Sequence, residues 1–141
     1  QRVVMKNLLS LLIGLGFVIS ACAQTPPNMI GTWTSIVSYT IMGSGSHHQS
    51  NSAKDNEIYF DKKLVTMVID RQEGINFAGT ISSKDYKEVI LGAIALDYQG
   101  GVLVDSDGTA TFKIIDANTM QNCYVQMAKP KVASCQEFKK Q

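Results

Sequence analysis

Apolar and polar residues alternate with a period of two along most of the chain beyond residue 29. Over residues 30–41, one face carries Trp33, Val37, Tyr39 and Ile41, whereas the other face is mainly threonine and serine. Such alternation is typical of a strand that buries one face and exposes the other. Trp33 and Tyr39 are therefore expected to point into a core.

Several segments of this kind follow one another, separated by turn-forming residues. We expect strands at residues 30–41, 57–70, 75–81, 89–96, 102–105, 110–115, 123–127 and 132–138. Short strands joined by hairpin-length turns are typical of a meander that closes on itself. The chain is therefore predicted to be all-β, a single small antiparallel up-and-down β-barrel of about eight strands. Such a barrel has room inside for side chains or one small ligand.

Three local signals add detail to this prediction. Asp107-Gly108 predicts a type I′ hairpin turn, in which both central residues have a positive φ. Residues 82–87 are an exception to the β pattern and predict a turn of helix. Residues 43–56 form one long polar insert with Ala53 as its single apolar member. Loops of this kind lie at a barrel mouth and contact a target, or they are simply mobile.

The first 23 residues differ in composition from the rest and resemble a bacterial export signal. Lys6, with Arg2 before it, precedes an apolar run that ends in Ala21-Cys22-Ala23. The apolar run is about 14 residues long, short of the roughly 20 that cross a hydrocarbon core as a helix. We therefore expect residues 1–23 to be an export signal, residues 24–29 a short tether, and residues 30–141 the barrel.

The end of this segment allows three interpretations. Ile19-Ser20-Ala21-Cys22 resembles the lipobox of bacterial lipoproteins. This resemblance implies that Cys22 carries a lipid and that the lipid anchors the protein to a membrane. Ala21 and Ala23 equally fit ordinary signal cleavage after Ala23, and an uncleaved anchor is the third interpretation. The predicted location is the cell envelope, in the periplasm or at the outer membrane of a bacterium, or outside the cell.

Charge and length limit the function of the remaining part. The whole chain has a formal net charge of +1, with 13 basic and 12 acidic residues. Without Arg2 and Lys6, the remaining part of about 118 residues has a net charge of −1 and room for one domain. A near-neutral domain without a basic block is not expected to bind nucleic acid.

Two of the three cysteines are predicted to form a disulfide. The midpoint between Cys123 and Cys135 is residue 129, which lies in the predicted Lys129-Pro130 turn. In a hairpin centred there the two residues face each other at a Cα distance of about 4.5–5.5 Å, which a disulfide can bridge. Export would supply the oxidising compartment that the bond needs.

Gly31-Thr32-Trp33 opens the first strand and resembles the Gly-x-Trp signature of the calycin barrels, the lipocalin and avidin group. In those families the glycine lets the chain bend into the barrel. The tryptophan plugs the closed end under a basic residue from the last strand, a role that Lys139 or Lys140 would take here. Biotin sites of the avidin type are walled by several tryptophans, and this chain has one, so the resemblance does not extend to biotin.

Few residues carry the marks of catalytic or metal chemistry. His47-His48 lacks a third ligand at metal-site spacing, so a solvated loop is the preferred interpretation. Asp105-Ser106-Asp107-Gly108 is similar to the start of a calcium loop but lacks the late glutamate, which favours a hairpin turn. We find no nucleophile elbow, phosphate loop or paired acid and base. The sequence predicts a protein that is not an enzyme and has no metal or cofactor.

Two functions are compatible with an exported barrel. The first is binding of a small apolar or amphipathic ligand at the open end, with Tyr39, His47 and His48 as the expected contacts. The second is binding of an envelope protein, as in the small lipoprotein barrels that inhibit lysozyme; Ser106-Asp107-Gly108 is similar to part of their motif. A deep apolar pocket would favour the first function, and a filled barrel with a protruding loop the second.

Overall fold

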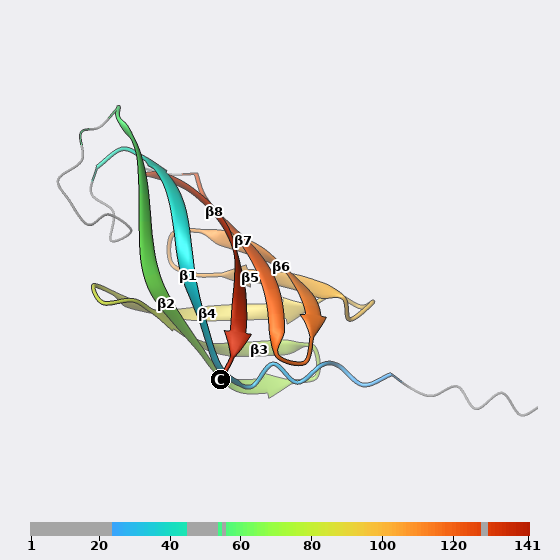
Figure 1. Cartoon of the computed structure of the whole chain (residues 1–141). Helices are drawn as coiled ribbons and strands as arrows, with labels where there is room; N and C mark the ends of the chain where they lie inside the picture. The colour runs from blue at the N-terminus through green and yellow to red at the C-terminus, as the bar shows by residue number, and fades with distance from the viewer. Residues whose placement is uncertain (1–23, 45–53, 55, 128–129) are drawn as a thin grey trace, which may run out of the picture.

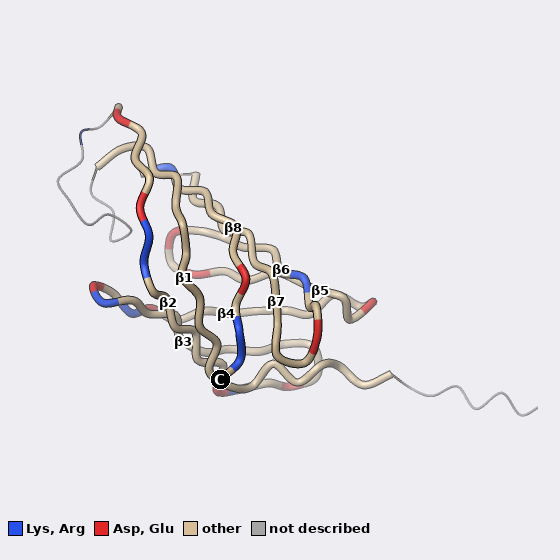
Figure 2. The backbone as a smooth tube through the Cα atoms, in the orientation of Figure 1, with Lys and Arg blue, Asp and Glu red and all other residues tan. Residues whose placement is uncertain are grey.

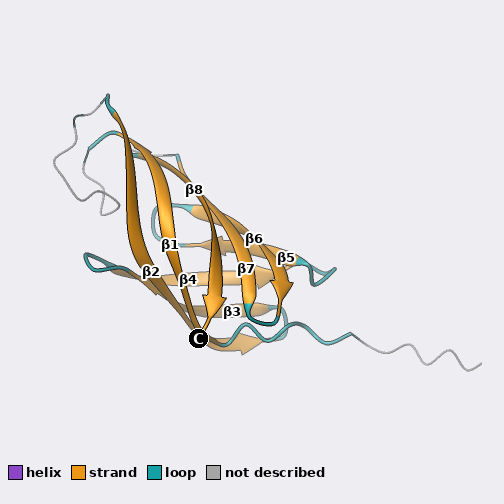
Figure 3. Cartoon of the chain, viewed as in Figure 1, coloured by secondary structure: helices purple, strands orange, loops and turns teal. Residues whose placement is uncertain are grey.

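The computed structural model describes residues 24–44, 54, 56–127 and 130–141, and these residues contain strands and no helix (Figure 1, Figure 3). The predicted all-β fold is confirmed. The strands are β1 (Gly31–Met42), β2 (Ile58–Glu73), β3 (Asn76–Ser82), β4 (Lys87–Ile94), β5 (Gly100–Val104), β6 (Thr109–Asp116), β7 (Thr119–Gln126) and β8 (Lys131–Lys140).

Each strand pairs antiparallel with its neighbour in sequence, and β1 also pairs with β8, so the sheet closes into an eight-stranded up-and-down barrel. The barrel has two different ends (Figure 1). The short turns after β2, β4 and β6 lie at the end where β1 begins, which we call the closed end. The connections after β1, β3, β5 and β7 lie at the other end, which we call the open end.

The two-residue alternation of the sequence builds the core. In β1 every second residue from Trp33 to Ile41 is buried, and the intervening residues face outward or are partly exposed. The largest fully buried side chains are Trp33, Phe138, Met29, Ile41, Met67, Ile69, Ile94, Met120, Val37 and Val65. Because these residues come from both ends of the chain, the core exists only when β1 meets β8.

The predicted disulfide is confirmed. Cys123 on β7 and Cys135 on β8 are register partners with Cα atoms 4.1 Å apart, and their sulfur atoms are bonded. Both residues lie on the outer face of the barrel. The bond therefore joins two neighbouring strands without occupying the interior.

Two predicted turns differ from the structure. The helical turn expected at residues 82–87 is wrong: the Ser83 N–H donates to the Tyr86 carbonyl at 3.0 Å, which makes a tight turn between β3 and β4. The β5–β6 hairpin exists, but neither Asp107 nor Gly108 has the positive φ of a type I′ turn. The reason is the Asp105 side chain, whose Oδ1 accepts from the Gly108 N–H at 2.7 Å and fixes a different turn.

Charged residues are distributed over the barrel without a one-signed stripe. Figure 2 shows basic and acidic residues interspersed along β2 and β8. Within the described part of the chain, no helix is long and apolar enough to span a membrane.

Candidate functional site

The closed end is plugged by Trp33. Its ring is 2% exposed, and its Nε1–H donates to the Met29 carbonyl at 2.9 Å. Lys140, its register partner on β8, lies over the ring with Nζ 5.2 Å from the ring centroid. Gly31 has a φ of 143°, and a β-carbon there would collide with the Lys140 side chain. A glycine, a tryptophan and a lysine thus close this end together.

The segment before β1 is fixed to the same end. Met29 is 2% exposed, and its N–H donates to Gln72 Oε1 at 2.8 Å. The Gln72 amide donates in turn to the Pro27 carbonyl, and Lys140 Nζ donates to the Asn28 carbonyl. Residues 27–29 are therefore held against the closed end of the barrel.

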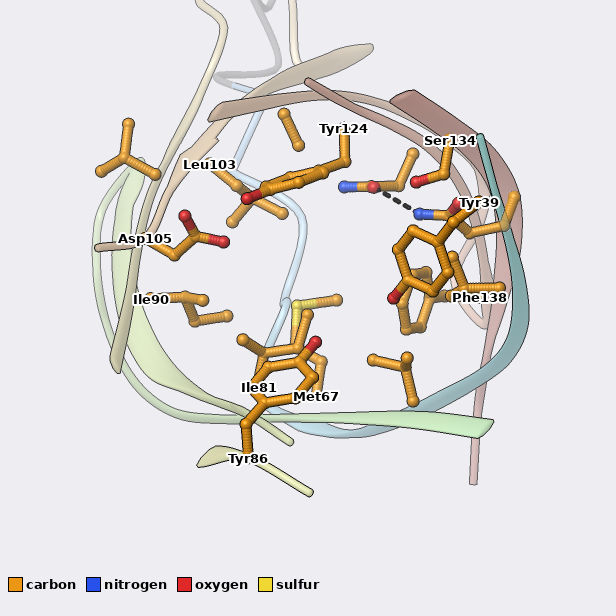
Figure 4. Close-up of a pocket in the computed structure, with 16 residues that line it drawn as sticks. Tyr39, Met67, Ile81, Tyr86, Ile90, Leu103, Asp105, Tyr124, Ser134 and Phe138 are labelled. Carbon is orange, nitrogen blue, oxygen red and sulfur yellow. Dashed lines mark hydrogen bonds between the residues drawn. The ribbon is translucent and has the colours of Figure 1, made fainter. Parts of the chain in front are cut away.

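A cavity lies inside the barrel above this plug, toward the open end (Figure 4). Its volume is about 40 Å³. At roughly 10–15 Å³ for each water, this space holds about three water molecules. The residues that border it are Val37, Tyr39, Val65, Met67, Ile81, Tyr86, Ile90, Leu103, Val104, Asp105, Ala110, Asn122, Tyr124, Ser134, Gln136 and Phe138.

The cavity has an apolar floor and a polar rim. Met67, on the floor, is the register partner of Trp33 and so lies next to the plug. Asp105 and Tyr86 belong to the β5–β6 and β3–β4 turns at the open end. Figure 4 shows the hydroxyls of Tyr39 and Tyr86 and the Asp105 carboxylate directed into the space between them. A molecule that enters would meet polar groups first and apolar walls beyond them.

Three tyrosines at the rim are held as neutral phenols. Burial raises the pKa of Tyr39 to about 12, although the hydroxyl that Tyr86 donates to it acts in the opposite direction. Burial is also the main cause that raises the pKa of Tyr86 and of Tyr124. Tyr124 donates its hydroxyl to Asp107 Oδ1 at 2.8 Å. At neutral pH these groups therefore form hydrogen bonds and are not nucleophiles.

Carboxylates gather beside the tyrosines. The carboxylate oxygens of Glu88, Asp105 and Asp107 lie within 4.8 Å of one another, and Ser106 Oγ donates to Glu88 Oε2. Burial raises the pKa of the Asp105 carboxyl, whereas the Gly108 N–H lowers it. Three carboxylates are fewer than the six to eight oxygen ligands that calcium takes, so the cluster by itself does not define a metal site.

Two polar atoms at the cavity have no hydrogen-bond partner. Ser134 is 7% exposed, and its Oγ points into the cavity without a partner. Gln136 donates from Nε2 to Asn122 Oδ1 at 2.8 Å, but its own Oε1 is buried and accepts no bond. A buried polar group without a partner costs about 1–3 kcal/mol. These two oxygens are therefore buried acceptors beside the cavity that lack a donor.

The tyrosine cluster leads to a prediction for alkaline pH. In the folded protein Tyr39, Tyr86 and Tyr124 should ionise above the ordinary pKa of about 10. The unfolded chain loses these protons first, so the free energy of unfolding should fall as the pH rises from about 10 through the folded pKa of Tyr39 near 12. Phenolate absorbance during a pH titration would measure this.

The denatured chain is the control for that titration, because all five of its tyrosines should then titrate together. Tyr39→Phe should remove one late-ionising group. A folded protein whose tyrosines all titrate near the ordinary value would contradict the buried cluster.

The sequence identified part of this site. Tyr39 lies at the rim, where it was expected, and it shares the cavity wall with Tyr86, Asp105, Tyr124 and Ser134, which were not predicted as site residues. Inward alternation along β7 and β8 is the signal that could have found Tyr124 and Ser134. His47, His48 and Cys22 lie outside the described residues, as does most of the 43–56 loop.

No family model, curated protein or solved structure matches this chain. The resemblance to the calycin barrels therefore rests on Gly31-Thr32-Trp33 and stays a prediction.

Proposed function

We propose that this chain is a non-catalytic binding barrel that takes a small amphipathic molecule, or the end of a larger one, into its open end. The observation that carries this proposal is a cavity whose apolar floor lies below a rim of polar groups. Ligand sites have this composition in general: mostly apolar walls and a few converging polar groups that fix orientation.

The size of the cavity limits the ligand. A volume of about 40 Å³ admits a few heavy atoms and not a complete lipid chain. The floor formed by Met67 and Phe138 is closed by the Trp33 plug, so a ligand cannot extend through the barrel. The inserted part is therefore a short apolar group, with its polar end held at the rim.

We propose that the barrel works in the cell envelope and is anchored to a membrane by a lipid on Cys22. The composition of residues 1–23 supports export, and Ile19-Ser20-Ala21-Cys22 supports lipidation. The Cys123–Cys135 disulfide is consistent with an oxidising compartment. Cleavage after Ala23 is the alternative, and it would release the same barrel as a secreted protein.

The second candidate is a factor that binds an envelope protein, such as a lysozyme-type inhibitor. Its motif would have to project from the β5–β6 turn. In this turn Ser106 donates to Glu88 and Asp107 accepts from Tyr124, so the polar groups are engaged at the barrel mouth. We therefore favour the small-molecule ligand.

A matched pair of variants tests the binding proposal. Ala110 is 6% exposed and borders the cavity, whereas Ala133 faces outward on β8. With n-pentanol as the probe, an NMR chemical-shift titration should show saturable shifts at cavity residues of the natural chain. Ala110→Leu should fill the cavity and weaken pentanol binding by about tenfold or more, or about 1.4 kcal/mol. Ala133→Leu should bind as the natural chain does.

The opposite result would be equally clear. If Ala110→Leu and Ala133→Leu bind pentanol equally well, the probe does not enter the cavity and the proposal is wrong. The folded spectrum of each variant shows whether the barrel is intact.

A further inference from the structure

We propose that the polar end of the ligand is an organic cation with N–H donors, a primary ammonium group being the simplest form. This inference rests on the proposed function, because it assigns a chemical class to the molecule that the cavity would hold. It depends on the charge of the rim, the composition of the wall and the two oxygens without partners.

The charges around the rim are negative. Asp105 is in the cavity wall, and the carboxylates of Glu88 and Asp107 lie beside it. Asp61 on β2 is the register partner of Tyr39 and adds a further carboxylate near the Tyr39 hydroxyl. Opposite charge favours a cation at this position, and a carboxylate or phosphate ligand would be repelled.

No basic side chain is among the described residues that border the cavity. Lys63 lies on the inward-facing side of β2, on the same face as Asp61 and Val65, and its side chain is 9% exposed. Its Nζ lies 3.3 Å from Asp85 Oδ2 in the β3–β4 turn, and it does not line the cavity. Lys63 is therefore paired with Asp85 beside the rim, and the described cavity wall itself contains no lysine or arginine.

The unpartnered oxygens favour a donor as well as a charge. Ser134 Oγ, in a residue that is 7% exposed, and Gln136 Oε1 can both accept a hydrogen bond. An ammonium group has three N–H donors and no acceptor. It can therefore donate hydrogen bonds to these oxygens and to the Asp105 carboxylate. A ligand that offers only acceptors could accept from the Ser134 hydroxyl, but it would leave Gln136 Oε1 without a donor.

Three probes of the same length separate charge from shape. We would titrate n-pentylammonium, n-pentanol and pentanoate into the full chain at neutral pH and follow cavity residues by NMR. Pentylammonium should bind about tenfold more tightly than pentanol, a difference of about 1.4 kcal/mol. Pentanoate should bind more weakly than either.

A second pair of variants assigns the preference to one carboxylate. Asp105→Asn removes the charge and keeps an oxygen that can accept from the Gly108 N–H. It should lower pentylammonium affinity about tenfold, or about 1.4 kcal/mol, and lower the affinity of the uncharged pentanol by much less. Asp97→Asn is the control, because Asp97 Oδ1 accepts from the Gln99 N–H in the same manner, but in the turn after β4 at the closed end. It should change neither affinity.

The failures of the two proposals differ. If pentanol or pentanoate binds the cavity as tightly as pentylammonium, the cation inference is overturned and the binding barrel stands. The inference is also overturned if Asp105→Asn leaves pentylammonium affinity unchanged. If none of the probes shifts a cavity residue, both proposals are overturned. The dispersed NMR spectrum of Asp105→Asn shows whether the variant is folded.

Discussion

Replacing Trp33 with alanine is expected to lower the free energy of unfolding by about 3–5 kcal/mol. The ring is fully buried between Met29 and Lys140 and closes one end of the barrel. Its removal leaves a space that β1, already paired with both β2 and β8, cannot collapse to fill. Urea unfolding followed by circular dichroism would measure the change.

Lys140→Met tests the contribution of the lysine charge separately from the burial of the Trp33 ring. This variant keeps most of the packing on the ring and loses the cation–π contact, which is worth about 0.5–1 kcal/mol at an exposed site. The loss should therefore be much smaller than for Trp33→Ala. A natural chain whose tryptophan fluorescence has the emission maximum of indole in water would contradict the buried plug.

Removing the disulfide should have the second largest effect. The bond closes a loop with a sequence separation of 12, and loss of such a cross-link costs about 3 kcal/mol if the stabilisation comes from restricting the unfolded chain. The double variant Cys123→Ala, Cys135→Ala should lower the free energy of unfolding by about this amount. Because both side chains lie on the outer face, the variant opens no cavity in the core.

The reduced natural chain is the matched comparison for this variant, and the two should unfold at the same urea concentration. Thiol titration of the unfolded but unreduced chain checks the bond directly. If Cys123 and Cys135 both react as free thiols, the disulfide does not form in the protein.

The strands and the core could be predicted because alternation is a local property. Each inward position of β1 is specified by its neighbours two residues away, so Trp33 and Tyr39 could be placed before the structure was known. The disulfide followed from the same logic, since a hairpin fixes which residues face each other. Two turns could not be placed this way, because the Asp105 side chain and a Ser83–Tyr86 hydrogen bond determine them.

The cavity could not be predicted from any one segment. Its rim combines Tyr39 from β1, Tyr86 and Asp105 from two turns, and Tyr124 from β7. These residues meet only because β1 closes on β8, a pairing between strands almost the whole chain apart. Burial by this closure also raises the pKa of Tyr39, which an isolated strand would leave unchanged.

The attachment of Pro27 and Met29 to the closed end determines the direction in which an anchored barrel would face. Cys22 is five residues before Pro27, a span of at most about 18 Å at roughly 3.6 Å per residue. A lipid on Cys22 would therefore hold the plugged end close to the bilayer, with the negative rim turned away from it. In that orientation the barrel would collect its ligand from the surrounding water and not from the lipid layer beneath it.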